Sequence, residues 1–118
     1  MSHLVQIKTK VHDPAAVTAA CRRLGLSEPV HGITQLFSGE ATGLLVKLPG
    51  WRYPAVIDTL TGTIKYDNYQ GHWGEQTEID RFLQMYAVEK AKLEARKKGY
   101  CVSEQVRQDG SIVIQIAT

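Results

Sequence analysis

One histidine of the sequence stands near a carboxylate, in a stretch where acid–base chemistry could be arranged. His72 follows Asp67 within residues 66–73, which also hold Tyr66 and Tyr69. A histidine beside a carboxylate can act as a general base near neutral pH. No candidate nucleophile accompanies the pair. A small-molecule enzyme that uses His72 and Asp67 is therefore one hypothesis, and it requires a pocket that only a structure can show.

The familiar motifs of catalysis and nucleotide binding are absent from the sequence. It contains no P-loop, dinucleotide-binding glycine motif, zinc-protease histidine pair, nucleophile elbow or EF-hand loop. The glycines of residues 38–43 (SGEATG) connect two expected strands and precede no helix, so they lack the helix amides that hold a phosphate. We interpret this segment as a hairpin loop.

The residues that most often bind metals are scattered rather than grouped. They are His3, His12, His31, His72, Cys21 and Cys101. No pair among them has the spacing of a zinc or redox motif. We therefore expect no metal site, no cofactor and two reduced thiols.

Aromatic residues concentrate in two stretches of the middle of the chain, at 51–53 and 66–73. Tryptophan, tyrosine and arginine are enriched in protein interfaces, because they bury much area and keep a polar group. The first hypothesis is a small non-catalytic accessory or regulatory protein that binds a protein partner through Trp51, Arg52, Tyr53, Tyr66, Tyr69, His72 and Trp73. The alternative is that two or three of these rings cover the open face of a sheet.

A further hypothesis is binding of RNA or single-stranded nucleic acid. Bases stack on aromatic rings while positive side chains contact the phosphates. The candidate phosphate contacts are Arg52, Lys65, Arg96, Lys97 and Lys98. A net charge of +2 is modest for this function, and acidic residues interrupt the basic end of the last helix.

The composition is that of one globular domain, residues 1–118. Apolar residues make up 43% and charged residues 22%, and 118 residues are enough for one core but short for two. The N-terminal residues MSHLVQIKTKVHD do not resemble a signal peptide, and no apolar run has the length of a membrane span. We expect a cytoplasmic protein with no membrane partner.

Residues 77–99 are predicted to form the main helix. Thr77 would be the N-cap, with Asp80 completing a capping box, and Gly99 would end the last turn. Apolar residues recur at helical spacing, which predicts one face that packs on a sheet: Ile79, Phe82, Leu83, Tyr86 and Leu93. This helix is expected to organise the remaining strands.

The other segments predict one shorter helix and seven strands. Asp13 and Pro14 begin the helix as N-cap and first residue, and Gly25 ends it. Alternating residues predict a strand at 4–11, four short strands within 32–67 and a hairpin around Asp109 and Gly110. The order β-α-β-β-β-β-α-β-β predicts an α+β two-layer sandwich, with a mainly antiparallel sheet and two helices on one face.

Both ends of the chain resemble a known family. MSHLVQIKTKVHD, with a helix ending in LGL, and RFLQMYAVEKAKLEARKKGYCVSEQVRQDGSIVIQIA resemble domain-of-unknown-function family 1257 (DUF1257), which includes the conserved reading frame thirty-five of plastids and cyanobacteria. The resemblance implies an α+β protein with a small accessory role in a prokaryotic, plastid or phage setting. The motif positions are His3, Tyr86, Gly99, Glu104 and Gln105, and the resemblance implies no role for them.

Self-association is a further expectation. The final predicted strand, SIVIQIA at residues 111–117, has no charge. At a sheet edge such a strand can pair with a second chain. A homodimer is therefore expected if this strand lies at an edge.

Overall fold

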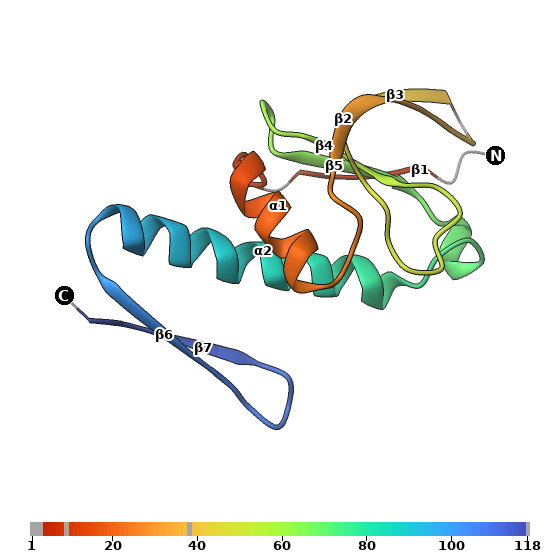
Figure 1. The fold of residues 1–118 in the computed structure, drawn as a ribbon. Coiled ribbons are helices and arrows are strands. Elements are labelled where there is room, and N and C mark those ends of the chain that lie inside the picture. Colours follow the sequence, from red (N-terminus) through yellow and green to blue (C-terminus); the bar gives the residue numbers. More distant parts are fainter. Residues whose placement is uncertain (1–3, 9, 38, 118) are drawn as a thin grey trace.

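The computed structural model describes the chain except for residues 1–3, 9, 38 and 118. Its elements are β1 (Leu4–Lys8), α1 (Pro14–Arg23), β2 (Val30–Leu36), β3 (Gly39–Val46), β4 (Ala55–Asp58), β5 (Thr63–Asp67), the 3-10 turn η1 (Tyr69–Gly71), α2 (Gln76–Lys97), β6 (Cys101–Val106) and β7 (Ile112–Ala117) (Figure 1). The predicted α+β class and element order are confirmed, with η1 as an addition.

Five of the strands form one antiparallel sheet in the order β1-β5-β4-β3-β2. Strands β2 to β5 form a meander in which each strand pairs with the next along the chain. β1 then adds to the free side of β5, with Leu4 opposite Asp67 and Lys8 opposite Thr63. The two edges of the sheet are therefore β1 and β2.

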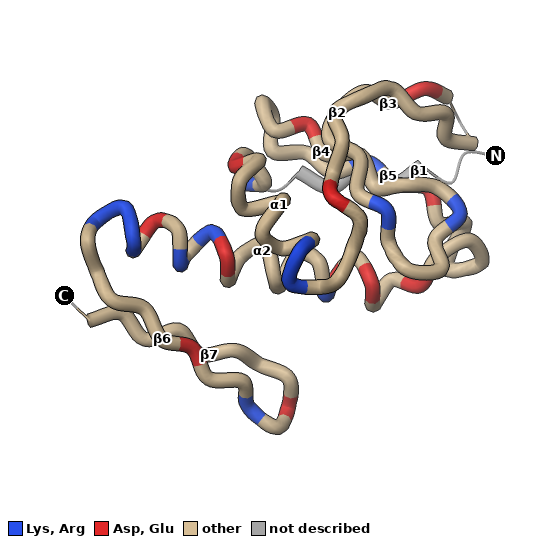
Figure 2. Tube along the Cα trace, in the orientation of Figure 1, with Lys and Arg blue, Asp and Glu red and all other residues tan. Residues whose placement is uncertain are grey.

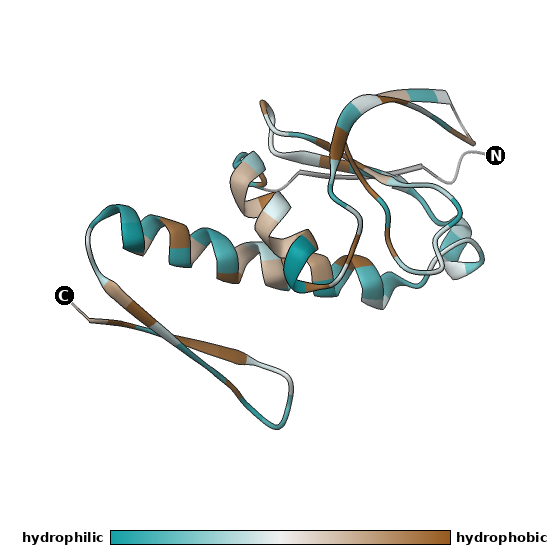
Figure 3. Ribbon diagram, viewed as in Figure 1, coloured by the Kyte–Doolittle hydropathy of each residue, from teal (hydrophilic) through white to brown (hydrophobic). Residues whose placement is uncertain are grey.

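Both helices pack on the same face of this sheet, as the sequence predicts. One core joins α1, α2 and the strands through Ala16, Val17, Ala20, Cys21, Val46, Ile57, Ile64, Ile79, Phe82 and Tyr86. Figure 3 shows hydrophobic residues along α1 and the strands, whereas both ends of α2 are hydrophilic. The helices meet each other as well, because Lys90 donates to Asp13 at 3.0 Å and Asp13 N donates to the Tyr86 hydroxyl at 3.2 Å.

A smaller apolar cluster lies on the opposite face of the sheet. It is formed by Leu36, Ala41 and Val56, with Leu45 and Tyr53 packed against them. The ring of Tyr53 therefore covers part of the face that carries no helix. This is the arrangement that the sheet-covering alternative predicts for some of the aromatic residues.

The ends of α1 agree with the sequence prediction. The Asp13 side chain accepts a hydrogen bond from Ala15 N at 3.0 Å, and Pro14 is the first helical residue. Gly25 ends the turn at φ +71°, a backbone conformation that favours glycine. Cys21 is fully buried on the inner face, and burial raises the pKa of its thiol to about 11.

The start of α2 differs from the prediction. The N-cap is Glu75 rather than Thr77, and Thr77 lies inside the first turn with its hydroxyl 3.5 Å from a Glu75 carboxylate oxygen. The predicted capping box is therefore wrong. The other end is confirmed, because Gly99 has φ +78° and follows the C-cap Lys98.

β6 and β7 form a separate two-stranded antiparallel sheet. Figure 1 shows α2 running between this hairpin and the five-stranded sheet. Glu104 of β6 ties the hairpin to both helices, since it accepts from Arg23 at 2.8 and 2.9 Å and from Lys92 at 3.5 Å. The turn at Asp109 and Gly110 is confirmed, with Gly110 at φ +88°.

None of the helices in the described part of the chain is both long and apolar enough to cross a bilayer.

Candidate functional site

Two loops meet beside β5, at the end of the five-stranded sheet where Asp67 lies. One connects β3 to β4 and carries residues 51–53, and the other runs from β5 through η1 to α2. Arg52 N donates to Trp73 O at 2.8 Å, and the Trp51 indole donates to Glu75 O at 3.1 Å. These two hydrogen bonds hold the loops together.

The second loop is tightly folded by its own backbone. Gly71 N and Trp73 N both donate to Asn68 O, at 3.0 and 2.9 Å. Three successive residues have positive φ, namely Tyr69 (47°), Gln70 (53°) and Gly71 (96°). Such values are uncommon outside glycine, and strained backbone of this kind is concentrated at binding sites.

Trp73 is the centre of the aromatic contacts. Its ring centroid lies 4.8 Å from that of Tyr69, 5.2 Å from that of Phe37 and 5.6 Å from that of Tyr53. The Arg52 guanidinium carbon lies 5.1 Å from the Trp73 ring centroid, which is within cation–π distance. Five side chains from three separate segments therefore form one contiguous group.

The outer part of this group is accessible to a partner. Phe37 is 55% exposed and Tyr69 is 37% exposed, and Arg52 and His72 are also exposed. Trp73 is half-buried beneath them, and the rings of Tyr69 and His72 lie 4.9 Å apart. We call Phe37, Arg52, Tyr69, His72 and Trp73 the aromatic surface.

Three of the sequence-predicted rings lie beneath or beside this surface. Tyr66 is only 3% exposed and belongs to the main core. Trp51 is half-buried, with its ring 5.3 Å from that of Tyr66, and Tyr53 packs on the sheet. These residues support the loops from within, whereas Arg52, Tyr69, His72 and Trp73 form the surface.

His72 and Asp67 are not brought together in the described part of the chain. His72 is exposed at the end of η1, and no hydrogen bond joins it to Asp67. Asp67 is fully buried, and neither of its carboxylate oxygens has a hydrogen-bond partner among the described residues. The geometry of a catalytic pair is therefore not present here.

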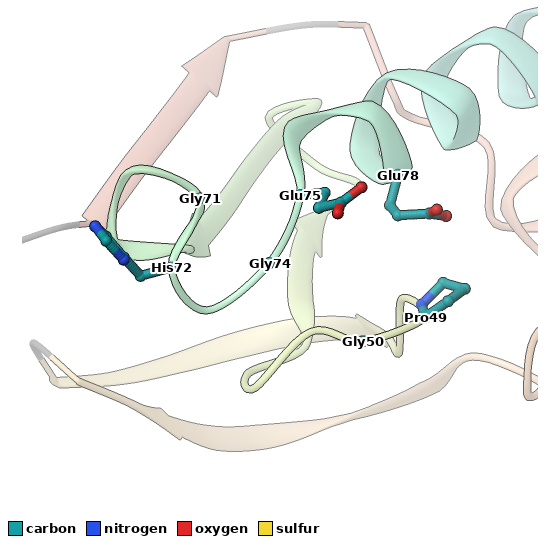
Figure 4. A pocket seen from close by; sticks show the side chains of 7 residues that line it. All are labelled: Pro49, Gly50, Gly71, His72, Gly74, Glu75 and Glu78. Carbon is teal, nitrogen blue, oxygen red and sulfur yellow. The ribbon is translucent and has the colours of Figure 1, made fainter.

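An open cleft of about 440 Å³ lies next to the aromatic surface. It is lined by Pro49, Gly50, Gly71, His72, Gly74, Glu75 and Glu78. Figure 4 shows the His72 imidazole pointing away from the two glutamates. Among the described residues, no group of three histidine, cysteine or acidic side chains could hold a metal ion.

The candidate phosphate contacts do not share one face. Arg96, Lys97 and Lys98 stand at the C-terminal end of α2, and Figure 2 places that end across the molecule from the loops that carry Arg52. Lys65 lies on β5 and is half-buried. Lys97 is also paired with Glu94 at 3.7 Å. A continuous basic face is therefore not formed by these residues.

Sequence reasoning missed Phe37. It directly follows β2, 36 positions before Trp73. Only the folding of the β2–β3 hairpin toward the second loop brings the two rings together. The available signal was an aromatic residue at a hairpin turn, next to Ser38 and Gly39.

No protein-family model, curated protein or solved structure matches this chain. The resemblance to DUF1257 stays a prediction, and of its motif positions His3 lies outside the described residues.

Proposed function

We propose that this protein is a small accessory or regulatory protein of the cytoplasm, without catalytic activity, that binds a protein partner through the aromatic surface. The partner residues expected there are an apolar side chain over Phe37 and Tyr69 and a carboxylate facing Arg52. Among the described residues no carboxylate pairs with Arg52, so its charge is available to a partner.

The observation that carries the proposal is the stacking of Arg52 on Trp73, whose ring also contacts the exposed rings of Phe37 and Tyr69. A guanidinium held at 5.1 Å from an indole ring is already ordered, so binding costs less side-chain entropy. Phe37 adds an exposed apolar ring, and exposure of such a ring to water is unfavourable unless a partner covers it. Arginine and aromatic residues in this arrangement are typical of interface hot spots.

The test compares Arg52→Ala with the matched control Arg96→Ala. Each tagged full-length variant is purified from its host after nuclease treatment, and the bound proteins are quantified by mass spectrometry. The stoichiometric partner of the wild type is expected to be lost or weakened at least about tenfold in Arg52→Ala. Arg96→Ala is expected to retain it, because Arg96 stands at the far end of α2.

A partner that binds the Arg52→Ala and Phe37→Ala variants with the same affinity as the wild type would contradict this site.

The second candidate is RNA or single-stranded nucleic acid, which the same exposed rings beside Arg52 would favour through base stacking. Recovery of RNA, with loss of every bound protein after nuclease, would support that candidate. Its binding would also weaken steeply with salt.

A further inference from the structure

The second sheet edge, β2, lacks the charged residues and prolines that keep many edge strands unpaired. Its seven residues, Val30–Leu36 (VHGITQL), include no lysine, arginine, acidic residue or proline. Val30 is 63% exposed and Ile33 is 67% exposed. Edge strands of monomers are normally short, charged or interrupted, because their free amides and carbonyls otherwise attract another strand.

The opposite edge differs in this respect. β1 has five residues and ends with Lys8, a residue typical of protected edges. β2 is longer, uncharged and apolar at its centre. A long and uncharged edge strand such as β2 favours pairing with another strand.

The order of residues in β2 identifies what covers it. Read from Ile33 outward, the strand has the same kind of residue on both sides: Gly32 and Thr34 are small, His31 and Gln35 are polar, and Val30 and Leu36 are apolar. We propose that β2 pairs antiparallel with β2 of a second copy, around a two-fold axis at Ile33, so that two five-stranded sheets become one continuous sheet.

Under a two-fold axis, a residue that faces a second residue of the partner is itself faced by the partner's first residue, and only a residue on the axis faces its own copy. Pairing around Ile33 puts Ile33 against Ile33, His31 against Gln35 and Val30 against Leu36. Every cross-strand pair is then alike in polarity, and no like charges meet. This proposal is independent of the proposed function, although Phe37 directly follows β2 and borders both surfaces.

The final strand offers a weaker match. β7 (Ile112–Ala117) is also uncharged, and both strands of its two-stranded sheet are edges. Two-fold pairing around Ile114, however, would put Val113 against Gln115. Its apolar residues are also less exposed than those of β2, with Ile112, Val113 and Ile114 half-buried and Ile116 at 50%. The choice between the edges is therefore testable.

The experiment uses single cysteines in the full-length Cys101→Ser chain, which keeps the buried Cys21 and removes the exposed thiol. Ile33→Cys is expected to form a disulfide-linked dimer under mild oxidation, because the two thiols would face each other across the axis. Val30→Cys is the matched control. Its counterpart would lie six residues along the strand, roughly 20 Å away, so no linkage is expected.

A second measurement checks the assembly without oxidation. Light scattering is expected to give the mass of a dimer for the wild type and for Ile116→Lys. In Ile33→Lys two ammonium groups would meet at the axis, and the dimer dissociation constant is expected to rise about 100-fold. Circular dichroism confirms that each variant is folded.

Three results would overturn the proposal: a wild-type protein that is monomeric at all concentrations tested, equal linkage of Ile33→Cys and Val30→Cys, or linkage of Ile114→Cys in place of Ile33→Cys. The last result would assign the interface to β7.

Discussion

Gly74 is the residue that lets the two loops of the aromatic surface approach each other. It is buried, and a Cβ atom at this position would lie within 2.6 Å of ring carbons Cγ and Cε2 of Trp51. Gly74→Ala is therefore expected to lower the free energy of unfolding by about 1–3 kcal/mol. Chemical denaturation measures this change, and tryptophan fluorescence reports the displacement of Trp51.

Gly32→Ala is the matched control for this substitution. Among the described residues, a Cβ atom there would meet Leu45 Cδ1 alone, at the ordinary contact distance of 3.8 Å. A loss of stability as large as that of Gly74→Ala would show that any glycine substitution weakens the sheet, and would contradict the role assigned to the Trp51 contact.

Asp67 is expected to be a source of instability. A buried polar group without a hydrogen-bond partner costs free energy. Asp67→Leu replaces the two carboxylate oxygens with methyl groups on the same branched side chain, so it is expected to raise the free energy of unfolding by about 1 kcal/mol. Denaturation midpoints of the two proteins measure the difference.

The control is Asp58→Leu. The Asp58 carboxylate accepts a hydrogen bond from Leu60 N at 3.0 Å, which leucine cannot accept, so this replacement is expected to lower stability. Loss of stability in Asp67→Leu as well would show that the Asp67 carboxyl group has a partner in solution.

At the scale of elements, Glu104 contributes to the attachment of the β6–β7 hairpin, beside the hydrogen bond from Gln84 to Gly110 O. Hydrogen bonds from Arg23 hold the pKa of the Glu104 carboxyl below its usual range, against the opposing effect of partial burial. Because the folded state favours the ionised carboxylate, this stabilisation is full above the unfolded pKa, about 4.3, and is lost as the pH falls through the folded pKa.

Glu104→Gln is accordingly expected to cost about 1 kcal/mol at pH 7 and nothing near pH 2. Chemical denaturation at the two pH values measures the cost. Glu28→Gln is the control, since the side chains of the Arg22–Glu28 pair are 73% and 66% exposed and such pairs contribute little. An equal cost for Glu104→Gln at both pH values would contradict the electrostatic explanation.

The sequence predicts the elements well where local chemistry decides them. Asp13 and Pro14 mark the start of α1 because their capping contacts involve only neighbouring residues. The start of α2 was misplaced because tertiary contacts position it. The Trp51 indole donates to Glu75 O, and Asn68 Nδ2 donates to Gly74 O. Because these hydrogen bonds fix the backbone just before the helix, α2 begins at Gln76, one residue before Thr77.

The sequence predicted most residues of the site, but it did not predict which of them are buried and which are exposed. Tyr66 lies in β5 and Tyr69 in the turn that follows it, where the alternation of the strand has ended, so the sequence could not show that Tyr66 is buried while Tyr69 is exposed. Phe37 was missed for a related reason, because its contact with Trp73 depends on the pairing of β2 with β3 and on the path of a distant loop.

At the scale of the whole molecule, α2 contacts both the five-stranded sheet and the β6–β7 hairpin. Ile79 and Phe82 enter the main core, whereas Val88 and Ala95 are buried outside that core. The sequence could not show that β6 and β7 leave the main sheet, because strand pairing is decided by long-range contacts. The result is an elongated protein with extents of 51 × 31 × 23 Å.

The place of β1 beside β5 has a consequence for how the protein is made. A chain leaves the ribosome N-terminus first, so β1 is synthesised before β5, the strand with which it pairs. β1 therefore cannot pair until the chain has been synthesised as far as Asp67. Strands β2 to β5 can each pair with the next as it appears, since hairpins close quickly over short loops. We therefore expect this sheet to form from β2 toward β5, with β1, which is synthesised before them, added last.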